Sequence, residues 1–518
     1  QQPSVPFHRQ TVSRPREDDR KVGAGNGRHE NPGRARMAAR PERTTAGKQK
    51  RKGDNRNDGQ PCPVPAPCGP PAPDLIERKA RELKAIRREP RKFGCAALWE
   101  ALTEVSRDAR ASLTRVAVHL SACCGKVVSK QGVGDRLNDG FVALLDWLGG
   151  VHLGQAYGSV AGNARGVFAP FARALVEDSS IISLPAHLAD TYHGPRNQSG
   201  KPQAAMRLQT LLDLKTDTLV RISRSSFTDN DQGAAGQILE ILQPGDLVLR
   251  DLGYFVISVL GRIAARGAYF LSRLHSAAML LDPCTGRRIE LLALLRGRDT
   301  LDLDVLLGCG ERLPVRLVAC RVPPDVAEER RRQARQNRDK RADNSPRKLA
   351  LLDWELFVTN VPRHIWSTRI VAQVYGFRWR IEMLFKAWKS FLHLAAIEPK
   401  ASGQQVDSLV LARILHAIRF QSSTWQAVRY TLAQHGRQAS LLKTVSLLAG
   451  PGADLLRQAL RDTPELLADI LVRHCAYEKR RRVSYADALE FYGSPQDAPP
   501  RLTAPAVSQQ GTRQALTP

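Results

Sequence analysis

Hydrophobic and polar positions divide the chain into a helical first part, a strand-rich middle and a helical last part. Residues 74–88 are predicted to form a charged helix that Pro90 stops, since proline cannot continue a helix. Further helices are predicted at 97–122 and 134–148, and through 404–475. Short apolar runs in the middle of the chain predict strands at 172–185, 206–216, 217–225, 245–251, 268–274 and 354–361.

The order of these elements predicts the fold class. Three antiparallel strands, a helix at 231–242, a strand, a helix at 254–266 and another strand follow the order of an α/β, RNase H-like domain. Three strand-like runs, RRIELLALL, DTLDLDVLL and LPVRLVACRV, predict a β-rich insertion, and a charged helix and loop should follow at 325–348. The predicted domains are a disordered basic segment at 1–73, an N-terminal helical DNA-binding region at 74–165, a catalytic domain at 166–400 with the insertion at about 275–353, a C-terminal helical region at 401–485 and a tail at 486–518.

One segment, YGFRWRIEMLFKAWK, concentrates polar side chains on a single face of a predicted helix. Each residue of an α-helix advances by about 100°, so Tyr375, Arg378, Glu382, Lys386 and Lys389 fall on one side. The opposite side carries an apolar stripe that we expect to be buried, formed by Phe377, Leu384, Phe385, Trp388, Phe391 and Leu392. For an arbitrary helix, a solvated face with a Glu382–Lys386 ion pair would explain the same pattern.

The spacing Tyr-x2-Arg-x3-Glu-x6-Lys resembles the signature of the DDE transposases of the insertion sequence 4 family. The run from Arg378 to Lys389 is especially similar to members that excise DNA through a hairpin. The resemblance covers about residues 95–475 and is most specific at 351–392. It implies a DNA transposase that binds element ends and catalyses metal-dependent DNA cleavage and strand transfer.

Phosphodiester cleavage by two metal ions requires carboxylates that hold the ions about 4 Å apart. Glu382 is the one acid on the predicted helix face, so two more must come from strands. Asp178, in ALVEDSSIISLP, and Asp251, in DLVLRDLGYF, are the predicted partners, because both contexts are similar to those of the family's two aspartates. Alternation along the strand sends Glu177 to the other face.

Other interpretations of these acids stay open. Asp178 caps a local turn in the simplest alternative, and Asp251 is an N-cap of the following helix. Asp190, in a polar loop, and Asp246, in a turn before a strand, are the competing candidates. If Asp178, Asp251 and Glu382 form the site, their carboxyl carbons should lie within roughly 8 Å of one another.

The resemblance also implies a cofactor and DNA contacts. Two Mg²⁺ ions are expected, and Mn²⁺ should substitute for them. In the family the corresponding Tyr, Arg and Lys contact DNA near the cleaved end, which assigns Tyr375, Arg378 and Lys389 to DNA binding. Lys386 on the same helix face would follow neighbouring phosphates.

A tryptophan in hairpin-forming relatives stacks on a base flipped out of the duplex. Trp354, in LLDWELFVTN, is similar in position, although its register to the end of the strand is one residue longer than expected. A tryptophan packed in the strand core is the alternative, and Trp379 is the second candidate for the stacking role.

Composition fits a polyanionic partner. The 518 residues carry a formal net charge of +27 and a pI of about 10.2, which points to nucleic acid, although an arginine-rich coding background would also raise the charge. The expected partner is double-stranded DNA, both terminal inverted repeats and target, bound by a homodimer that pairs the ends. No apolar run is long enough to predict a membrane span.

The nine cysteines form no CxxC pair, which argues against a zinc site, and their odd number fits a reducing cytoplasm. Together with the resemblance, which implies a bacterial, nucleoid-associated protein, this gives the expectation of a cytoplasmic location. The chain begins with Gln1, and Met37 is its first methionine, so residues 1–36 are interpreted as upstream sequence read in frame. Two alternatives to a transposase stay open: an inactive DNA-binding relic or domesticated protein, and an RNase H-like nuclease without strand transfer.

Overall fold

The computed structural model describes residues 71–159, 166–195, 202–337, 344–450 and 463–478, together with Ala453 and Gln458. The predicted disordered segment up to residue 70, most of the basic run at 478–482 and the tail from 486 lie outside these residues. The described residues between 71 and 335 and between 344 and 478 belong to one compact unit, which contains the candidate site.

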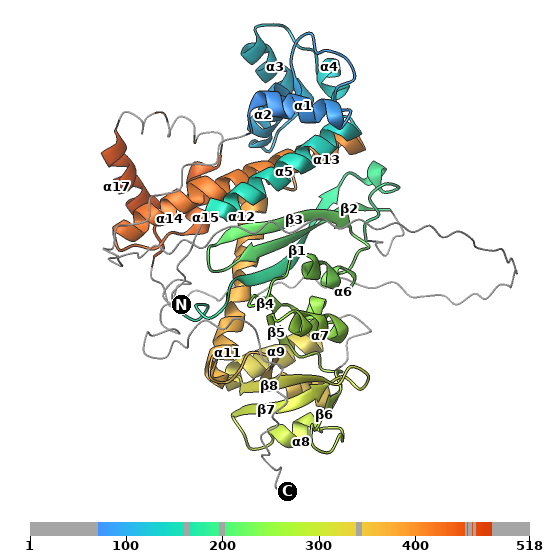
Figure 1. Ribbon diagram of the computed structural model, residues 1–518, viewed down its shortest axis with the longest axis vertical. Coiled ribbons are helices and arrows are strands. Elements are labelled where there is room, and N and C mark those ends of the chain that lie inside the picture. The colour runs from blue at the N-terminus through green and yellow to red at the C-terminus, as the bar shows by residue number, and fades with distance from the viewer. Residues whose placement is uncertain are drawn as a thin grey trace, which may run out of the picture. The chain divides into compact units, whose positions relative to one another are not determined.

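A mixed nine-stranded sheet organises the middle of the chain (Figure 1). Its strand order is β3-β2-β1-β4-β5-β9-β8-β7-β6. β1 and β4, and β4 and β5, pair in parallel, whereas the other neighbours are antiparallel. The strands are β1 (Ala174–Leu184), β2 (Ala204–Asp213), β3 (Thr218–Ser226), β4 (Leu247–Arg250), β5 (Tyr269–Arg273), β6 (Leu280–Leu281), β7 (Thr300–Leu307), β8 (Leu313–Arg321) and β9 (Trp354–Thr359).

The two faces of the sheet carry two separate hydrophobic cores. Successive side chains of a strand point to opposite faces, and in β4 this places Leu247 and Leu249 in one core and Val248 in the other. The first core also contains Ile381 and Leu384 of the motif helix. The second core is covered by the short helices α7 (Ile257–Ala265) and α8 (Leu291–Leu295) and by a 3₁₀ helix at Ala235–Glu240, which directly follows α6 (Asp231–Ala234). The α/β class is therefore as predicted.

The N-terminal region is helical, but its helices are shorter than predicted. The expected helix at 97–122 is two helices, because the chain turns between them and the Ser112 hydroxyl caps the second by accepting the backbone N–H of Arg115. The expected helix at 74–88 ends at Glu82, and Lys84 follows with a φ of 61°. The helices are α1 (Pro73–Glu82), α2 (Cys95–Ser106), α3 (Leu113–Cys124), α4 (Lys130–Gly134) and α5 (Asp139–Ser159).

The C-terminal helices pack with this region. α13 contacts both α5 and α2 (Figure 1). Arg224 of β3 joins the helices to the sheet, because its guanidinium pairs with Asp146 of α5 at 2.6 Å and with Asp407 of α13 at 2.5 Å. The helices are α13 (Gly403–Arg419), α14 (Trp425–Gln434), α15 (Leu441–Leu448) and α17 (Pro464–His474), with a π-helical turn at Phe420–Thr424. Among the described residues, no helix is both long and apolar enough to cross a bilayer.

The segment between β5 and β9 contains strands that extend the same sheet, since β8 pairs antiparallel with β9. Two of its three predicted strands are present as β7 and β8. The prediction for RRIELLALL was wrong, because Leu291–Leu295 is the helix α8. Leu291 and Leu295 lie one turn apart and are both buried, and leucine and alanine favour helix over strand. The charged stretch that follows contains α9 (Pro324–Gln336) and α10 (Pro346–Leu351).

The motif segment is helical but not one continuous α-helix. It consists of α11 (Thr368–Tyr375), a 3₁₀ turn at Gly376–Arg378 and α12 (Trp379–Phe391). The predicted apolar stripe is buried at Phe377, Leu384, Phe385, Trp388 and Leu392. α12 packs against β1 and α15, so this stripe fixes the polar face of the helix beside the sheet.

The core contains a buried ion pair between neighbouring strands. Arg250 donates to Glu177 at 2.6 Å, and the side chains are 0% and 2% exposed. Removing one partner of such a pair leaves an uncompensated buried charge, which costs about 3–5 kcal/mol. We predict that Arg250→Met lowers the midpoint of chemical denaturation markedly, whereas Arg262→Met, at an exposed position of α7, leaves it nearly unchanged. Equal midpoints for the two variants would show that the pair contributes little.

Candidate active site

Two aspartates follow the point where the pairing of two neighbouring parallel strands ends, Asp178 within β1 and Asp251 directly after β4. The register of β1 and β4 places Glu177 beside Arg250, so the next residues, Asp178 and Asp251, are also neighbours. Alternation turns both aspartates toward the sheet face that α12 covers, and turns the Glu177–Arg250 pair toward the other face. The predicted orientation of Glu177 away from the site is therefore confirmed.

Glu382 and Arg378 reach the same place from the motif helix. The Arg378 guanidinium contacts three carboxylates: Glu382 at 2.5 Å, Asp178 at 3.4 Å and Asp251 at 3.6 Å. Each carboxylate meets a different nitrogen, respectively Nη2, Nη1 and Nε. The structure thus brings together the three acids proposed from the sequence, and we call Asp178, Asp251 and Glu382 the carboxylate cluster.

The position of α12 is fixed by a second ion pair. Arg380 donates to Asp217 at 2.5 Å, and the same carboxylate accepts the indole N–H of Trp425 at 2.7 Å. Asp217 lies in the turn between β2 and β3 with a φ of 57° and is 2% exposed. Arg380 is two residues from Glu382, so this anchor ties the helix end that carries the acid to the sheet and to α14.

Burial and charge change the pKa values in the cluster. Burial raises the pKa of Asp178 to about 7, although Arg378 and the Ser179 backbone N–H act in the opposite direction. Burial would lower the pKa of Arg378, but the negative charges of Asp251 and its neighbours outweigh that effect and raise it. Arg378 therefore stays a cation, and it is the group that balances the negative charge of the cluster.

Tyr375 supports the cluster from its buried side. Its hydroxyl donates to Asp251 at 3.1 Å, and the residue is 9% exposed. The ring centroid lies 5.1 Å from that of Phe357 on β9, and the Arg378 guanidinium lies 5.9 Å from it. Burial and the Asp251 charge both raise the pKa of the phenol, so it remains a hydrogen-bond donor.

The remaining predicted DNA contacts separate into two groups. Lys386, Lys389 and Trp379 are exposed on α12, and Trp379 is 44% exposed. Trp354 does not join them. Alternation along β9 puts it on the same face as Leu356, where it packs against the second hydrophobic core, opposite Phe357 and the cluster. The expectation that Trp354 stands beside the cleaved end is therefore not supported by its position.

The competing aspartates are accounted for without a catalytic role. Asp246 is fully buried and pairs with Arg173 at 2.5 Å. Asp190 is exposed in a turn outside the strands. Neither reaches the carboxylate cluster.

Two supporting groups were missed from the sequence. Arg273, at the end of β5, lies with its guanidinium 5.7 Å from the Tyr375 ring centroid and 3.7 Å from Glu355. Strand order and alternation could have predicted Arg273 as a neighbour of the site. β5 pairs in parallel with β4, and alternation places Arg273 on the same face of the sheet as Asp251.

Behind β1, Asp231 accepts hydrogen bonds from Ser179 and Arg207, each at 2.9 Å. Asp231 also lies close to Gly253, two residues after Asp251. A Cβ at Gly253 would lie only 2.9 Å from an Asp231 oxygen, so the absence of a side chain there lets the loop after β4 pass close to α6. No sequence spacing links Asp231 to the cluster, and only the fold brings them near.

The donor set fits the divalent metal that the sequence implies. The cluster offers only carboxylate oxygens, and its three side chains are between 19% and 37% exposed, which leaves room for water and phosphate. Oxygen ligands of this kind suit Mg²⁺. As the side chains stand, no three His, Cys, Asp or Glu side chains among the described residues converge closely enough to hold a metal ion. In the carboxylate cluster, the Arg378 guanidinium lies between the three acids.

Comparison with known proteins agrees with this geometry. Residues 169–413 match the family model of the transposase DDE domain. The chain is 24% identical over 428 residues to the transposase for insertion sequence element IS231B of Bacillus thuringiensis subsp. berliner, covering 78% of this chain and 88% of that one. It is 26% identical over 423 residues to the IS231D transposase of B. thuringiensis subsp. finitimus, covering 77% and 87%.

A shorter match joins it to the putative transposase InsL of element IS186A of Escherichia coli K12, with 31% identity over 161 residues that cover 29% of this chain and 44% of that one. The family model and these relatives together support a DDE transposase.

The geometry predicts how Arg378 affects metal binding. Arg378→Gln should leave three mutually repelling carboxylates and lower the melting temperature in EDTA, and Mn²⁺ or Mg²⁺ should then raise it more than in the wild type, because a ligand that binds only the folded state stabilises it. Lys386→Gln removes the same charge from the same helix and is the control. An equal response to metal in both variants would show that the guanidinium does not compete with the ion.

Proposed function

We propose that this protein transposes an insertion sequence by cleaving DNA at the carboxylate cluster and joining the released ends to a target. The observation that carries the proposal is the meeting of Asp178, Asp251 and Glu382 around one guanidinium, although they come from three separate segments. The transposase relatives support this function. The motif favours the transposition chemistry of the insertion sequence 4 family, and within that family the type that forms a DNA hairpin.

The three acids would hold two Mg²⁺ ions, which Mn²⁺ can replace. When bound, such ions activate the attacking oxygen and stabilise the leaving oxygen of a phosphodiester. Tyr375 orients Asp251 through its hydrogen bond. Arg378, once released from the carboxylates, is placed to pair with a phosphate beside the scissile bond, because a guanidinium matches phosphate geometry as well as it matches carboxylate.

DNA would follow the exposed polar face of α12. Lys386 and Lys389 provide cations there, and Trp379 provides an exposed aromatic surface next to Arg378. The N-terminal helical region at 74–165 is the proposed first DNA-binding module, and residues 166–400 the RNase H-like catalytic domain. We expect a homodimer to pair the terminal inverted repeats, in the cytoplasm of a bacterium and at its nucleoid.

Glu382→Gln tests the catalytic assignment. The change keeps the shape of the side chain but removes the charge of a metal ligand, so we predict that Mg²⁺-dependent cleavage of an element-end duplex is lost. Binding to the same duplex should stay within about twofold, because phosphate contacts dominate DNA affinity. Gel-shift and cleavage assays on one protein preparation measure both. Loss of binding together with cleavage would make Glu382 a structural residue.

The same assay separates the possible activities. Wild-type protein that neither nicks nor joins the duplex would be an inactive relic, and protein that only cleaves would be a nuclease without strand transfer. Cleavage followed by joining is the expected result.

Trp379 and Trp354 can be distinguished by the step that each variant impairs. Hairpin formation requires a base held out of the helix, and stacking on an aromatic ring stabilises it. We predict that Trp379→Ala reduces hairpin formation more than the first nick, and that a missing base at that position partly restores it. Trp354→Ala should lower the melting temperature instead, because its ring packs against the second core. The opposite pattern would return the stacking role to Trp354.

A further inference from the structure

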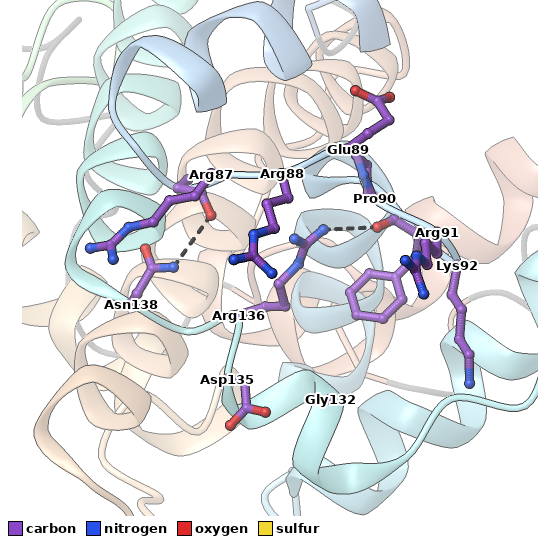
Figure 2. Close-up of a pocket in the computed structure, with 12 residues that line it drawn as sticks. Arg87, Arg88, Glu89, Pro90, Arg91, Lys92, Gly132, Asp135, Arg136 and Asn138 are labelled. Carbon is purple, nitrogen blue, oxygen red and sulfur yellow. Dashed lines mark hydrogen bonds between the residues drawn. The ribbon is translucent and has the colours of Figure 1, made fainter.

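A basic loop joins α1 to α2 and borders a pocket of about 570 Å³ (Figure 2). Helix α4 and the turn between α4 and α5 line the rest of this pocket. Residues 78–92 contain eight lysine or arginine residues and two glutamates. We propose that this loop, residues 84–92, binds the sugar–phosphate backbone of duplex DNA with residues other than those of the carboxylate cluster. The inference rests on the proposed function, since it takes the same DNA as its ligand.

The cations of loop 84–92 are available to a ligand. Its one acid, Glu89, is paired with Arg81 at 2.7 Å, and in Figure 2 the Glu89 carboxylate extends to the opposite side of the loop from the Arg88 guanidinium. Arg87, Arg88 and Arg91 are exposed. Within the part of the chain that the structure describes, none of these three arginines has an acidic partner.

The backbone of the loop is held in place on its inner side. Ala85 and Ile86 are buried, at 3% and 5% exposure. The Asn138 side chain donates to the Ala85 carbonyl at 3.3 Å. A Cβ at Gly140 would lie 2.4 Å from the Leu83 carbonyl oxygen, so α5 approaches the start of the loop as closely as glycine allows.

The far end of the loop is fixed in the same way. Arg136 donates to the Phe93 carbonyl at 3.0 Å, and its guanidinium lies 5.4 Å from the Phe93 ring centroid. Lys92 donates to the Val127 carbonyl at 2.8 Å. Because these contacts order the loop before any ligand arrives, binding to Arg87, Arg88 and Arg91 costs little backbone entropy.

The arrangement favours a DNA backbone over a small anion or a single-stranded base. The three arginines occupy positions 87, 88 and 91 of the loop, so they offer several cations to more than one phosphate of a DNA backbone. Arginine pairs with phosphate through two parallel hydrogen bonds. Phe93, the aromatic residue of the pocket, has Arg136 over one face of its ring, and a base could not stack on that face. Contacts of this kind position DNA without selecting sequence.

The test measures the salt dependence of binding to a short duplex of arbitrary sequence by fluorescence anisotropy. The full chain is compared with a triple variant, Arg87→Gln, Arg88→Gln and Arg91→Gln. Each lost phosphate contact removes about 0.9 from the slope of log Kd against log salt, so the rise in Kd between about 0.05 and 0.2 M salt should shrink by ~40-fold for three contacts. A matched triple variant, Arg262→Gln, Arg266→Gln and Arg298→Gln, removes the same charge from exposed positions and should keep most of the slope.

Replacing the three loop arginines by lysine should also preserve the slope, because point charges still neutralise phosphates. An unchanged slope in the glutamine variant, or an equal loss in both glutamine triples, would overturn the proposal. So would relief of DNA binding by millimolar inorganic phosphate in the wild type alone, which would indicate a small-anion site. If the loop variant melts early, Arg91→Gln alone, with an expected slope change of about 0.9, replaces it.

Mg²⁺-dependent cleavage of supercoiled plasmid by saturating wild-type protein reports the proposed function separately. Cleavage with an unchanged slope in the glutamine variant sinks only the inference about the loop. A reduced slope without any cleavage by the wild type sinks only the catalytic proposal.

Discussion

Three carboxylates that would otherwise repel one another share a single guanidinium. Charges of one sign held this close raise one another's pKa and oppose folding, and the cation of Arg378 among them offsets that repulsion. Other contacts in the middle of the chain hold these acids in position. Parallel pairing of β1 with β4 puts two acids side by side, and the Arg380–Asp217 pair fixes the helix that delivers the third.

Under the proposed function, this interaction would give Arg378 two roles in turn. The side chain that balances the acids would be released if metal ions took over that task. The same guanidinium would then have the charge and geometry to hold a phosphate. Metal binding and substrate binding would in this way be coupled through one side chain.

The periodicity of the sequence predicted which side chains share a face of a single strand or helix. Strand alternation separated Asp178 from Glu177, and helical spacing put Arg378 and Glu382 on one face. Local spacing could not predict the contacts between Arg378 and the two aspartates, because Asp251 and Asp178 lie about 127 and 200 residues away in the chain. Trp354 was assigned to the site although the burial of Leu356 and Val358 decides which face of β9 it occupies. RRIELLALL is helical because Leu291 and Leu295 are buried together.

The pairing of the end of β5 with β9 has a consequence for how the segment between them can change. Arg273 pairs with Phe357 in the sheet, so the backbone leaves and returns at adjacent positions, with about 80 residues between them. A segment whose two ends lie side by side in the sheet can change in length or be replaced without displacing β5 or β9, and another domain could be inserted there. Complete removal would be different. β9 would lose its neighbour β8 and become an exposed hydrophobic edge strand, to which a strand of another molecule could add. Removal of the segment between β5 and β9 would thus expose an edge of the sheet, whereas a change of length outside β8 would not.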